Sequence, residues 1–176
     1  NYPCQKIMEQ TVPVASTVDS YAIPKGGAPS FRVDNAHLLL EINATDGLKW
    51  RGKDNEIYRK RLEYELTIIQ QKNYSDFFLI TADVVQWAKR NQILVGPARG
   101  SAGGSLLCYV LGINEVDPIP FGLLFERFLS VDRFDYPDID LDFEQERRHL
   151  VLEYMTNKYG KDKVTSIATF AELKGK

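Results

Sequence analysis

Hydrophobic and polar positions follow the period of an α-helix through much of the first half of the chain. In residues 55–73 the apolar side chains Ile57, Leu62, Leu66 and Ile69 recur at helical spacing. Such a stripe is typical of an amphipathic helix with one buried side. The pattern therefore predicts a helix here, packed on the core by its apolar side.

The charged residues of the same stretch predict its exposed side. Glu63 and Glu65 stand among Arg59, Lys60 and Arg61. A helix face that carries charges of both signs is usually exposed to solvent. We interpret this run as a solvated face, and a functional surface is the alternative.

Two further helices are predicted on either side of this one. A short helix is expected from about Ala36 to near Gly47, since glycine favours a helix end. Residues 75–92 predict a longer helix, for which Ser75 is a suitable N-cap. The core face of this longer helix would be formed by Phe78, Ile80, Val84, Val85 and Trp87.

The second half of the chain alternates short apolar runs with helical patterns. We expect strands at 93–95, 136–143 and 163–170, and helices at 105–112, 123–129 and 144–160. Alternating strands and helices are typical of an α/β fold, in which helices pack on a sheet. The hydrophobic pattern thus predicts a fold of the α/β class.

Composition narrows the class of protein. The chain has 176 residues, of which 44% are hydrophobic and 26% charged, enough for the core of one domain or slightly more. A net charge of −2 argues mildly against a stand-alone DNA clamp, which is often basic. No apolar run approaches ~18 residues, so no membrane partner is expected.

The two cysteines predict no disulfide framework. Cys108 lies in the apolar run SLLCYVLG and is expected to be a small core residue, while Cys4 lies near the N-terminus. Two cysteines in a chain of this length are compatible with the reducing cytosol.

A turn of small residues is the first candidate for chemistry. The sequence GPARGSAGG, residues 96–104, stands between a predicted strand and a predicted helix. Helix N-termini and glycine-rich turns bind phosphate through backbone N–H groups, and Arg99 would add a charged, forked donor. Ser101 and Ser105 would cap the helix or donate to phosphate. The alternative is a capped turn with a surface arginine.

The second candidate is PDIDLDF, residues 137–143. Side chains alternate across a strand, so Asp138, Asp140 and Asp142 would share one face at roughly 6–7 Å spacing. Carboxylates are the ligands that Mg²⁺ and Mn²⁺ prefer. Aspartate is rare in strands, which favours a metal site over the alternative of a polar, half-exposed edge strand.

Taken together, the two candidates suggest nucleotidyl transfer, in which a metal held by aspartates meets the phosphates of a nucleotide. Arg127 lies between them in LLFERFL, a predicted apolar helix. A lone arginine in such a helix needs an anionic partner. That partner would be a structural carboxylate or a triphosphate.

The motifs that carry these residues resemble a known family. The stretch from VGPARGSAGGS through LLFERFL to YPDIDLDF is similar, in order and spacing, to the core of the bacterial replicative DNA polymerases of the C family, the DNA polymerase III alpha subunits. The resemblance covers roughly residues 31–170. Ala98 stands where a glycine is common in the family, which would stiffen the turn slightly.

The resemblance implies a set of site residues. Asp138 and Asp140 match the catalytic, metal-binding aspartates, whereas Asp142 matches an aspartate that is not usually assigned as a ligand. The implied cofactor is Mg²⁺, with Mn²⁺ as a possible substitute. The residues that match the triphosphate-binding positions are Arg99, Gly100, Ser101 and Arg127.

The resemblance also implies an architecture. Residues 1–36 would be the connection from a preceding PHP (polymerase and histidinol phosphatase) domain, and 37–176 a partial palm domain. That palm is a mixed β-sheet with packed helices, like the polymerase beta-like nucleotidyltransferases. Both ends look truncated, and the family's third catalytic aspartate is expected beyond Lys176.

The function implied is template-directed DNA synthesis, by two-metal-ion transfer of deoxynucleotides to a primer 3′ end. Its partners would be primed DNA, deoxynucleoside triphosphates, the remaining polymerase domains and other replisome subunits, in the cytoplasm. The 176 residues alone are expected to be inactive. The alternative is a non-catalytic module that binds metal and nucleotide on a palm-like fold.

Overall fold

The regular secondary structure in the part that the structure describes consists of helices. The computed structural model describes Pro13, Ser16, Thr17, Phe31, 33–130 and 136–166. Its α-helices are α2 (Ala36–Trp50), α3 (Glu56–Gln71), α4 (Ser75–Arg90), α5 (Leu106–Val110) and α6 (Arg148–Tyr159). Two 3₁₀ turns complete the set, η1 (Ser101–Gly104) and η2 (Phe125–Arg127).

Helix α2 begins where the sequence predicted and ends three residues later than Gly47. The Asn35 side chain caps it by accepting from the Leu38 N–H at 3.0 Å. Gly47 lies inside the helix, because α5 passes it so closely that a Cβ would lie 2.8 Å from the Val110 carbonyl carbon. This glycine therefore serves helix packing rather than helix termination.

Helix α3 confirms the predicted helix and most of its apolar stripe. Leu62, Leu66 and Ile69 are buried, whereas Ile57 in the first turn is 67% exposed. The Asn55 side chain caps the helix by accepting from two N–H groups of that turn. The expected core position at Ile57 is wrong, since no element covers the start of the helix on that side.

Helix α4 confirms the next predicted helix with a shifted cap. Tyr74 is the N-cap and makes no side-chain cap bond, while Ser75 lies buried in the first turn. The predicted core residues Phe78, Val84 and Val85 are fully buried. The other two, Ile80 and Trp87, are only partly buried.

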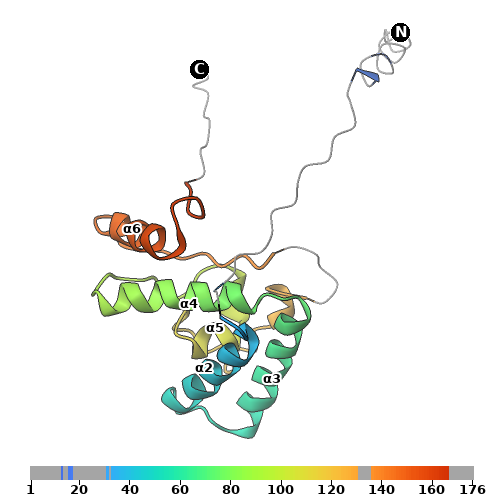
Figure 1. Cartoon of the computed structure of the whole chain (residues 1–176). Helices are drawn as coiled ribbons and strands as arrows, with labels where there is room; N and C mark the ends of the chain where they lie inside the picture. The colour runs from blue at the N-terminus through green and yellow to red at the C-terminus, as the bar shows by residue number, and fades with distance from the viewer. Residues whose placement is uncertain (1–12, 14–15, 18–30, 32, 131–135, 167–176) are drawn as a thin grey trace, which may run out of the picture.

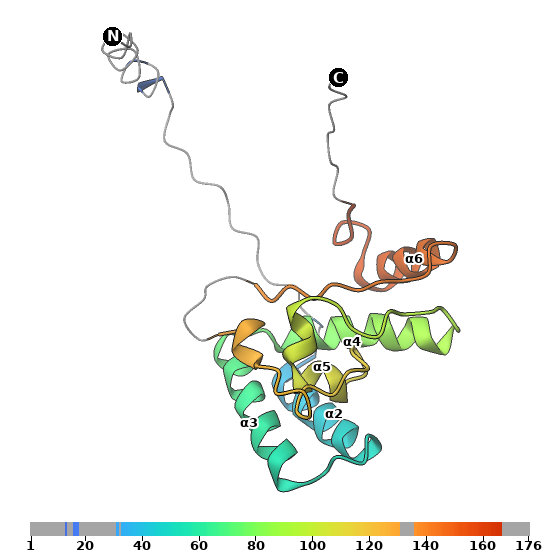
Figure 2. The ribbon, with the colours of Figure 1, turned by 180° about the vertical axis from the view of Figure 1, so that it is seen from behind.

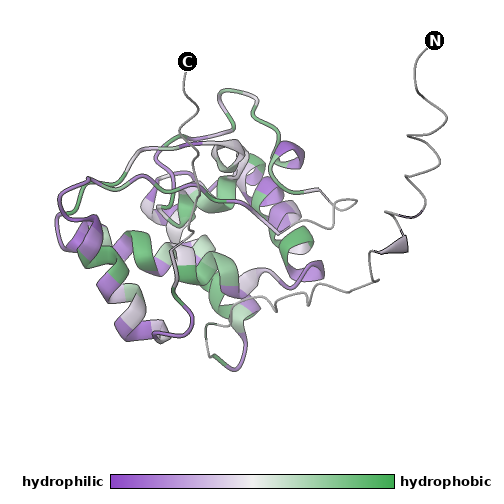
Figure 3. Ribbon diagram, turned by 90° about the horizontal axis from the view of Figure 1, so that it is seen from above, coloured by the Kyte–Doolittle hydropathy of each residue, from purple (hydrophilic) through white to green (hydrophobic). Residues whose placement is uncertain are grey.

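The helices form two packed groups that share α4. Figures 1 and 2 show α4 between α6 on one side and α2, α3 and α5 on the other. The larger core cluster joins α2, α3, α4 and α5, and a smaller one joins α4 to α6 through Val84, Ala88 and Val151. Hydrophobic and hydrophilic residues alternate around the helices in Figure 3, as helices with one buried side require.

The predicted α/β fold with a mixed-sheet palm is wrong for the described residues, which contain no β-strand. The single pairing among them is an isolated antiparallel bridge between Val95 and Phe143. The segment that was expected to be a strand at 93–95 follows α4 directly, and Ile93 still donates its N–H to Ala88 at 2.9 Å. One bridge leaves 136–143 extended but without a neighbouring strand to make a sheet.

The remaining expectations for the second half are met in part. The predicted helix 123–129 is reduced to η2, and the helices at 105–112 and 144–160 are shortened to α5 and α6. Gly160 ends α6 as predicted, with φ of 108°. Residues 163–166 carry no regular structure, and 167–170 lie outside the described residues.

Three further points concern the core cysteine, membrane spans and the predicted N-terminal connection. Cys108 is fully buried, as predicted. None of the helices in the described part of the chain is long and apolar enough to span a membrane. The predicted connection, 1–36, lies almost wholly outside the described residues.

Candidate functional site

The glycine-rich turn and the acidic segment meet where the isolated bridge joins them. Beside Val95 and Phe143, the Gly96 N–H donates to the Asp142 carbonyl at 2.8 Å, and the Glu144 N–H donates to the Leu94 carbonyl at 3.1 Å. These backbone bonds fix the register of the acidic segment against the turn. In Figure 1 the acidic segment, in orange, crosses beside α4 on its way to α6.

Arg99 connects the turn to two of the three aspartates. Its Nη1 donates to Asp142 Oδ1 at 2.8 Å, and its Nε lies 3.7 Å from Asp140 Oδ2. The hydrogen bond to Asp142 and the charge of Asp140 raise the pKa of the Arg99 guanidinium above its ordinary value. All three side chains are at least 40% exposed, so a ligand entering from solvent can reach the group.

Gly100 follows Arg99 in a backbone conformation that favours glycine. Its φ is 66° and its ψ is −159°. A Cβ at this position would lie 2.9 Å from Asp140 Oδ2, the end of an exposed side chain that can move aside. The turn therefore needs glycine for its backbone conformation.

Hydrogen bonds from two consecutive residues, Asn114 and Glu115, hold the turn on one side. The Glu115 N–H donates to the Pro97 carbonyl at 2.6 Å, and the Asn114 amide donates to the Ala102 carbonyl at 2.7 Å. Ser101, the first residue of η1, remains exposed. These two bonds fix one side of the turn, and its other side is open to solvent.

Ser105 caps a helix, which was one of the two roles expected for it; the other was donation to phosphate. It is fully buried and caps α5 by accepting from the Cys108 N–H at 3.2 Å. Its own hydroxyl donates to Glu65 Oε2 at 2.9 Å. Both functions of the hydroxyl are used inside the protein, so Ser105 is not available to phosphate.

Glu65 also belongs to this region, which the hydrophobic pattern did not predict. It was expected on a solvated face, yet its side chain is fully buried beneath η1 and α5. The signal was present in the spacing. Counting at helical intervals from Tyr58 through Leu62 to Ile69 places Glu65 on the buried stripe.

Neither Arg127 nor Asp138 forms an ion pair within the group around Arg99, although the charge of Asp138 also acts to raise the pKa of Arg99. Arg127 ends η2 with an exposed side chain, so the expectation that it lies in an apolar helix is wrong. Within the described residues no carboxylate lies within ion-pair distance of Arg127. Asp138 is exposed at the start of the acidic segment. The structure thus brings together Arg99, Gly100, Asp140 and Asp142 from the predicted set, with Ser101 next to them in sequence.

The carboxylates of the acidic segment suit a hard divalent cation. Asp138 and Asp140 offer oxygen ligands from one extended segment, and both are accessible to solvent. The described residues contain no group of three or more acidic, histidine or cysteine side chains that could hold a metal. The donors present therefore fit Mg²⁺ or Mn²⁺ in chemical type, as part of a ligand set.

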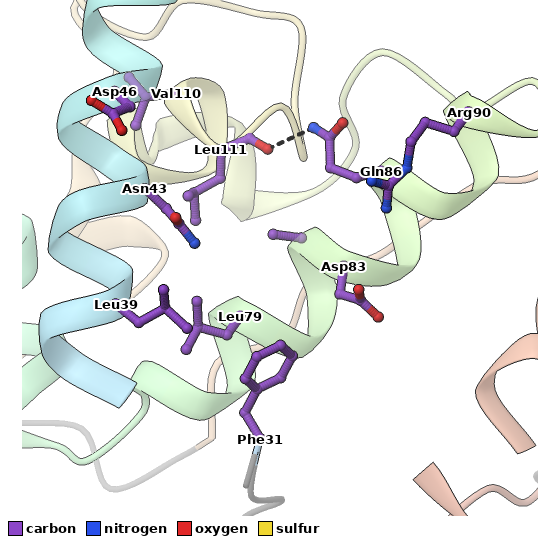
Figure 4. A pocket seen from close by; sticks show the side chains of 11 residues that line it. Phe31, Leu39, Asn43, Asp46, Leu79, Asp83, Gln86, Arg90, Val110 and Leu111 are labelled. Carbon is purple, nitrogen blue, oxygen red and sulfur yellow. Dashed lines mark hydrogen bonds between the residues drawn. The ribbon is translucent and has the colours of Figure 1, made fainter. Parts of the chain in front are cut away.

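A separate pocket of about 380 Å³ lies between α2 and α4, with α5 at its base. Figure 4 shows Leu39 and Asn43 of α2 across the cavity from Leu79 of α4, and Gln86 donating to the Leu111 carbonyl at 3.0 Å. Its described lining includes none of the predicted site residues.

Comparisons with known proteins support one family. The model of the family described as "Bacterial DNA polymerase III alpha NTPase domain" matches residues 38–176. The chain is 44% identical to DNA polymerase III subunit alpha of Aquifex aeolicus, over 97% of this chain and 15% of that protein. It is 50% identical to the subunit of Ureaplasma parvum, over 79% of this chain and 14% of that protein. The chain thus spans about 15% of the length of the curated relatives it matches.

Proposed function

The chain belongs to the bacterial DNA polymerase III alpha family, and from this we propose that it supplies the nucleotide- and metal-binding part of a DNA-directed DNA polymerase. The observation that carries the proposal is the contact of Arg99 with Asp140 and Asp142. It puts a phosphate-binding type of residue beside Asp140, one of the two predicted metal ligands, in one accessible place.

In the proposed reaction the primer 3′-oxygen attacks the α-phosphorus of a deoxynucleoside triphosphate. A new oxygen–phosphorus bond forms, the bond to the β-phosphate bridge breaks, and pyrophosphate leaves with the 3′-hydroxyl proton released. Asp138 and Asp140 would hold Mg²⁺, which lowers the pKa of the hydroxyl and neutralises phosphate charge when bound. Two-metal catalysis of this kind is part of the proposal.

The turn would receive the triphosphate. Gly100 and Ser101 are exposed and would donate through their backbone N–H groups and the serine hydroxyl, and Arg99 and Arg127 would add charged donors. A triphosphate would replace the carboxylates as partner of Arg99. Asp140 would then be free to bind the metal when the nucleotide binds.

The wider setting is proposed from the family. The substrates would be primed DNA and deoxynucleoside triphosphates, and the partners the other polymerase domains and replisome subunits, in the cytoplasm. We further propose that residues 37–176 form part of the catalytic region and that 1–36 connect it to a preceding domain.

A non-catalytic module that binds metal and nucleotide is the second candidate. The observation that favours it is the composition of the site. The described residues contain two matched aspartates but no cluster of three metal-binding side chains. The two candidates differ in one measurable property, which is phosphodiester bond formation.

The test replaces the matched aspartates in the full-length protein. Asp138→Asn and Asp140→Asn should each abolish primer extension, because an amide is a weak ligand for Mg²⁺, while the thermal unfolding temperature stays nearly unchanged. Glu146→Gln, at an exposed position beyond the acidic segment, is the matched control and should keep extension. Extension by either aspartate variant at the unmodified rate would refute the assignment.

A further inference from the structure

Glu65 is a charged residue that the proposed reaction does not use, yet it is fully buried under the turn. Its Oε1 accepts from Arg61 Nε at 2.7 Å and from the Leu106 N–H at 2.9 Å. Its Oε2 accepts from the Ser105 hydroxyl and the Leu107 N–H, each at 2.9 Å. Burial raises the pKa of Glu65, and the donors from Leu107, Leu106 and Arg61 oppose that rise.

These contacts exclude a role for Glu65 as a ligand. A carboxylate has about four lone-pair positions, and each oxygen here already receives two donors. The side chain is also 0% exposed. Neither a metal nor a substrate can reach it, so any effect on the reaction has to pass through the backbone that it holds.

That backbone belongs to the end of the glycine-rich turn. The donors come from Ser105, Leu106 and Leu107, which directly follow η1, so Glu65 ties the start of α5 to α3 across 40 residues of sequence. The first N–H groups of a helix have no partner within the helix. At α5 the Glu65 carboxylate accepts from two of these N–H groups. It thereby fixes the end of η1.

Arg61 extends the same network to the other side of η1. While its Nε binds Glu65, its Nη2 donates to the Gly104 carbonyl at 2.9 Å and to the Leu123 carbonyl at 3.1 Å. Gly104 also lies against the chain before η2, where a Cβ would come within 2.7 Å of the Leu124 carbonyl oxygen. One guanidinium thus holds η1, which follows Gly100, and the segment that leads to Arg127.

We propose that Glu65, with Arg61, is a positioning residue for the triphosphate. The pair holds the turn of Arg99, Gly100 and Ser101 and the η2 segment of Arg127 at a fixed separation, so that donors from both sides reach one ligand. This inference rests on the proposed function. It adds to that function two residues of α3, neither of which touches the nucleotide.

The test measures steady-state primer extension by Glu65→Gln in the full-length protein, with active enzyme counted by burst titration. Glutamine keeps the shape, but its NH₂ group would face two donors. The KM for deoxynucleoside triphosphate per active enzyme should rise by about tenfold or more, since small displacements of binding groups are costly. The Kd for primed DNA should stay unchanged.

Glu63→Gln is the matched control, since Glu63 is an exposed glutamate on the same helix. It should leave the KM unchanged. A merely structural role of Glu65 predicts a smaller fraction of active enzyme with an unchanged KM in the molecules that remain folded. That result would overturn the inference while leaving the proposed polymerase function intact, because the unmodified enzyme would still extend primers.

A second variant decides the case if Glu65→Gln fails to fold. Arg61→Lys keeps the positive charge beside Glu65 but loses the forked contact with the Gly104 and Leu123 carbonyls. It should also raise the nucleotide KM, by about threefold or more, with DNA affinity retained. An unchanged KM in Arg61→Lys would refute the positioning role. Absence of extension by the unmodified full-length protein would instead refute the proposed function itself.

Discussion

Gly47 illustrates how a single residue sets the distance between two helices. A Cβ there would press on the backbone of Val110, which cannot move without shifting α5. Gly47→Ala gains about 1 kcal/mol of helix propensity, but overpacking against backbone costs about 1–3 kcal/mol. We expect a net loss of stability of up to about 2 kcal/mol, measured by urea unfolding of the 176-residue chain.

Gly103→Ala is the control for this experiment. A Cβ at Gly103 would meet no atom within 4 Å, and its backbone is not in the left-handed region. Its stability should therefore change by less than about 0.5 kcal/mol. Equal effects of the two substitutions would contradict the close packing of α2 on α5 at Gly47.

Cys108 offers a chemical test at the residue scale. Burial raises the pKa of its thiol to about 12, so only about one thiol in ten thousand is ionised at pH 8. Iodoacetamide at pH 8 should leave Cys108 unmodified in the folded chain and alkylate it in urea, as followed by peptide mass spectrometry. Alkylation at similar rates in both conditions would show that this part of the core is open.

At the scale of elements, the helices of the first half could be predicted and the sheet could not. A helix makes its hydrogen bonds within one segment, so the spacing of Leu62, Leu66 and Ile69 was sufficient to identify α3. A strand needs a partner elsewhere in the chain. The alternating aspartates gave the extended conformation of 136–143 but could not show that Val95 alone would pair with it.

For the candidate site, residue types and order singled out Arg99, Gly100 and Asp140, and the structure places these three close together. Their roles in binding stay a prediction. The burial of Glu65 depends on the approach of α5, which local sequence does not contain. Its position on the apolar stripe was the available signal, and the neighbouring charges concealed it.

Helix α6 packs on α4 through Val84, Ala88 and Val151, and one carboxylate adds polar contacts that can be tested. Asp83 accepts from the hydroxyls of Tyr154 and Tyr159, both at 2.7 Å, and from Lys158 Nζ at 2.6 Å. Asp83→Asn should weaken this contact by about 1–2 kcal/mol. Amide exchange in α6 should then accelerate by about 5–30-fold, with α3 unchanged. Glu153→Gln, an exposed position on α6, is the control and should change neither.

Titration of Asp83 should make the attachment of α6 depend on pH. Burial acts to raise the pKa of Asp83, but bonds from Lys158, Tyr154 and Tyr159 outweigh it, and the pKa is lowered from its ordinary 3.8. The contact thus stabilises the fold fully above about pH 4 and is lost as pH falls through the lowered pKa. Amide protection of α6 should decline over that acid range, and Asp83→Asn should remove this part of the decline.

At the scale of the whole molecule, the described fold presents a prepared turn and a pair of aspartates rather than a complete catalytic centre. The backbone bonds at Gly96 and Glu144 fix the turn against the acidic segment, and Arg99 forms ion pairs with Asp140 and Asp142. The chain spans about 15% of its curated relatives, whose remaining parts would supply further groups. Binding of nucleotide and catalysis are therefore expected to be separable in the isolated chain.

The 176-residue chain should therefore bind deoxynucleoside triphosphate weakly and in a Mg²⁺-dependent manner, without extending a primer. Titration with a fluorescent nucleotide, with and without Mg²⁺, measures the first property, and a primed template measures the second. A chain carrying both Asp138→Asn and Asp140→Asn is the matched control and should lose the Mg²⁺-dependent part while Arg99 still attracts phosphate. Nucleotide affinity that does not respond to Mg²⁺ in the unmodified chain would contradict the pairing of turn and aspartates. Primer extension by this chain would show instead that its own carboxylates suffice for the chemistry.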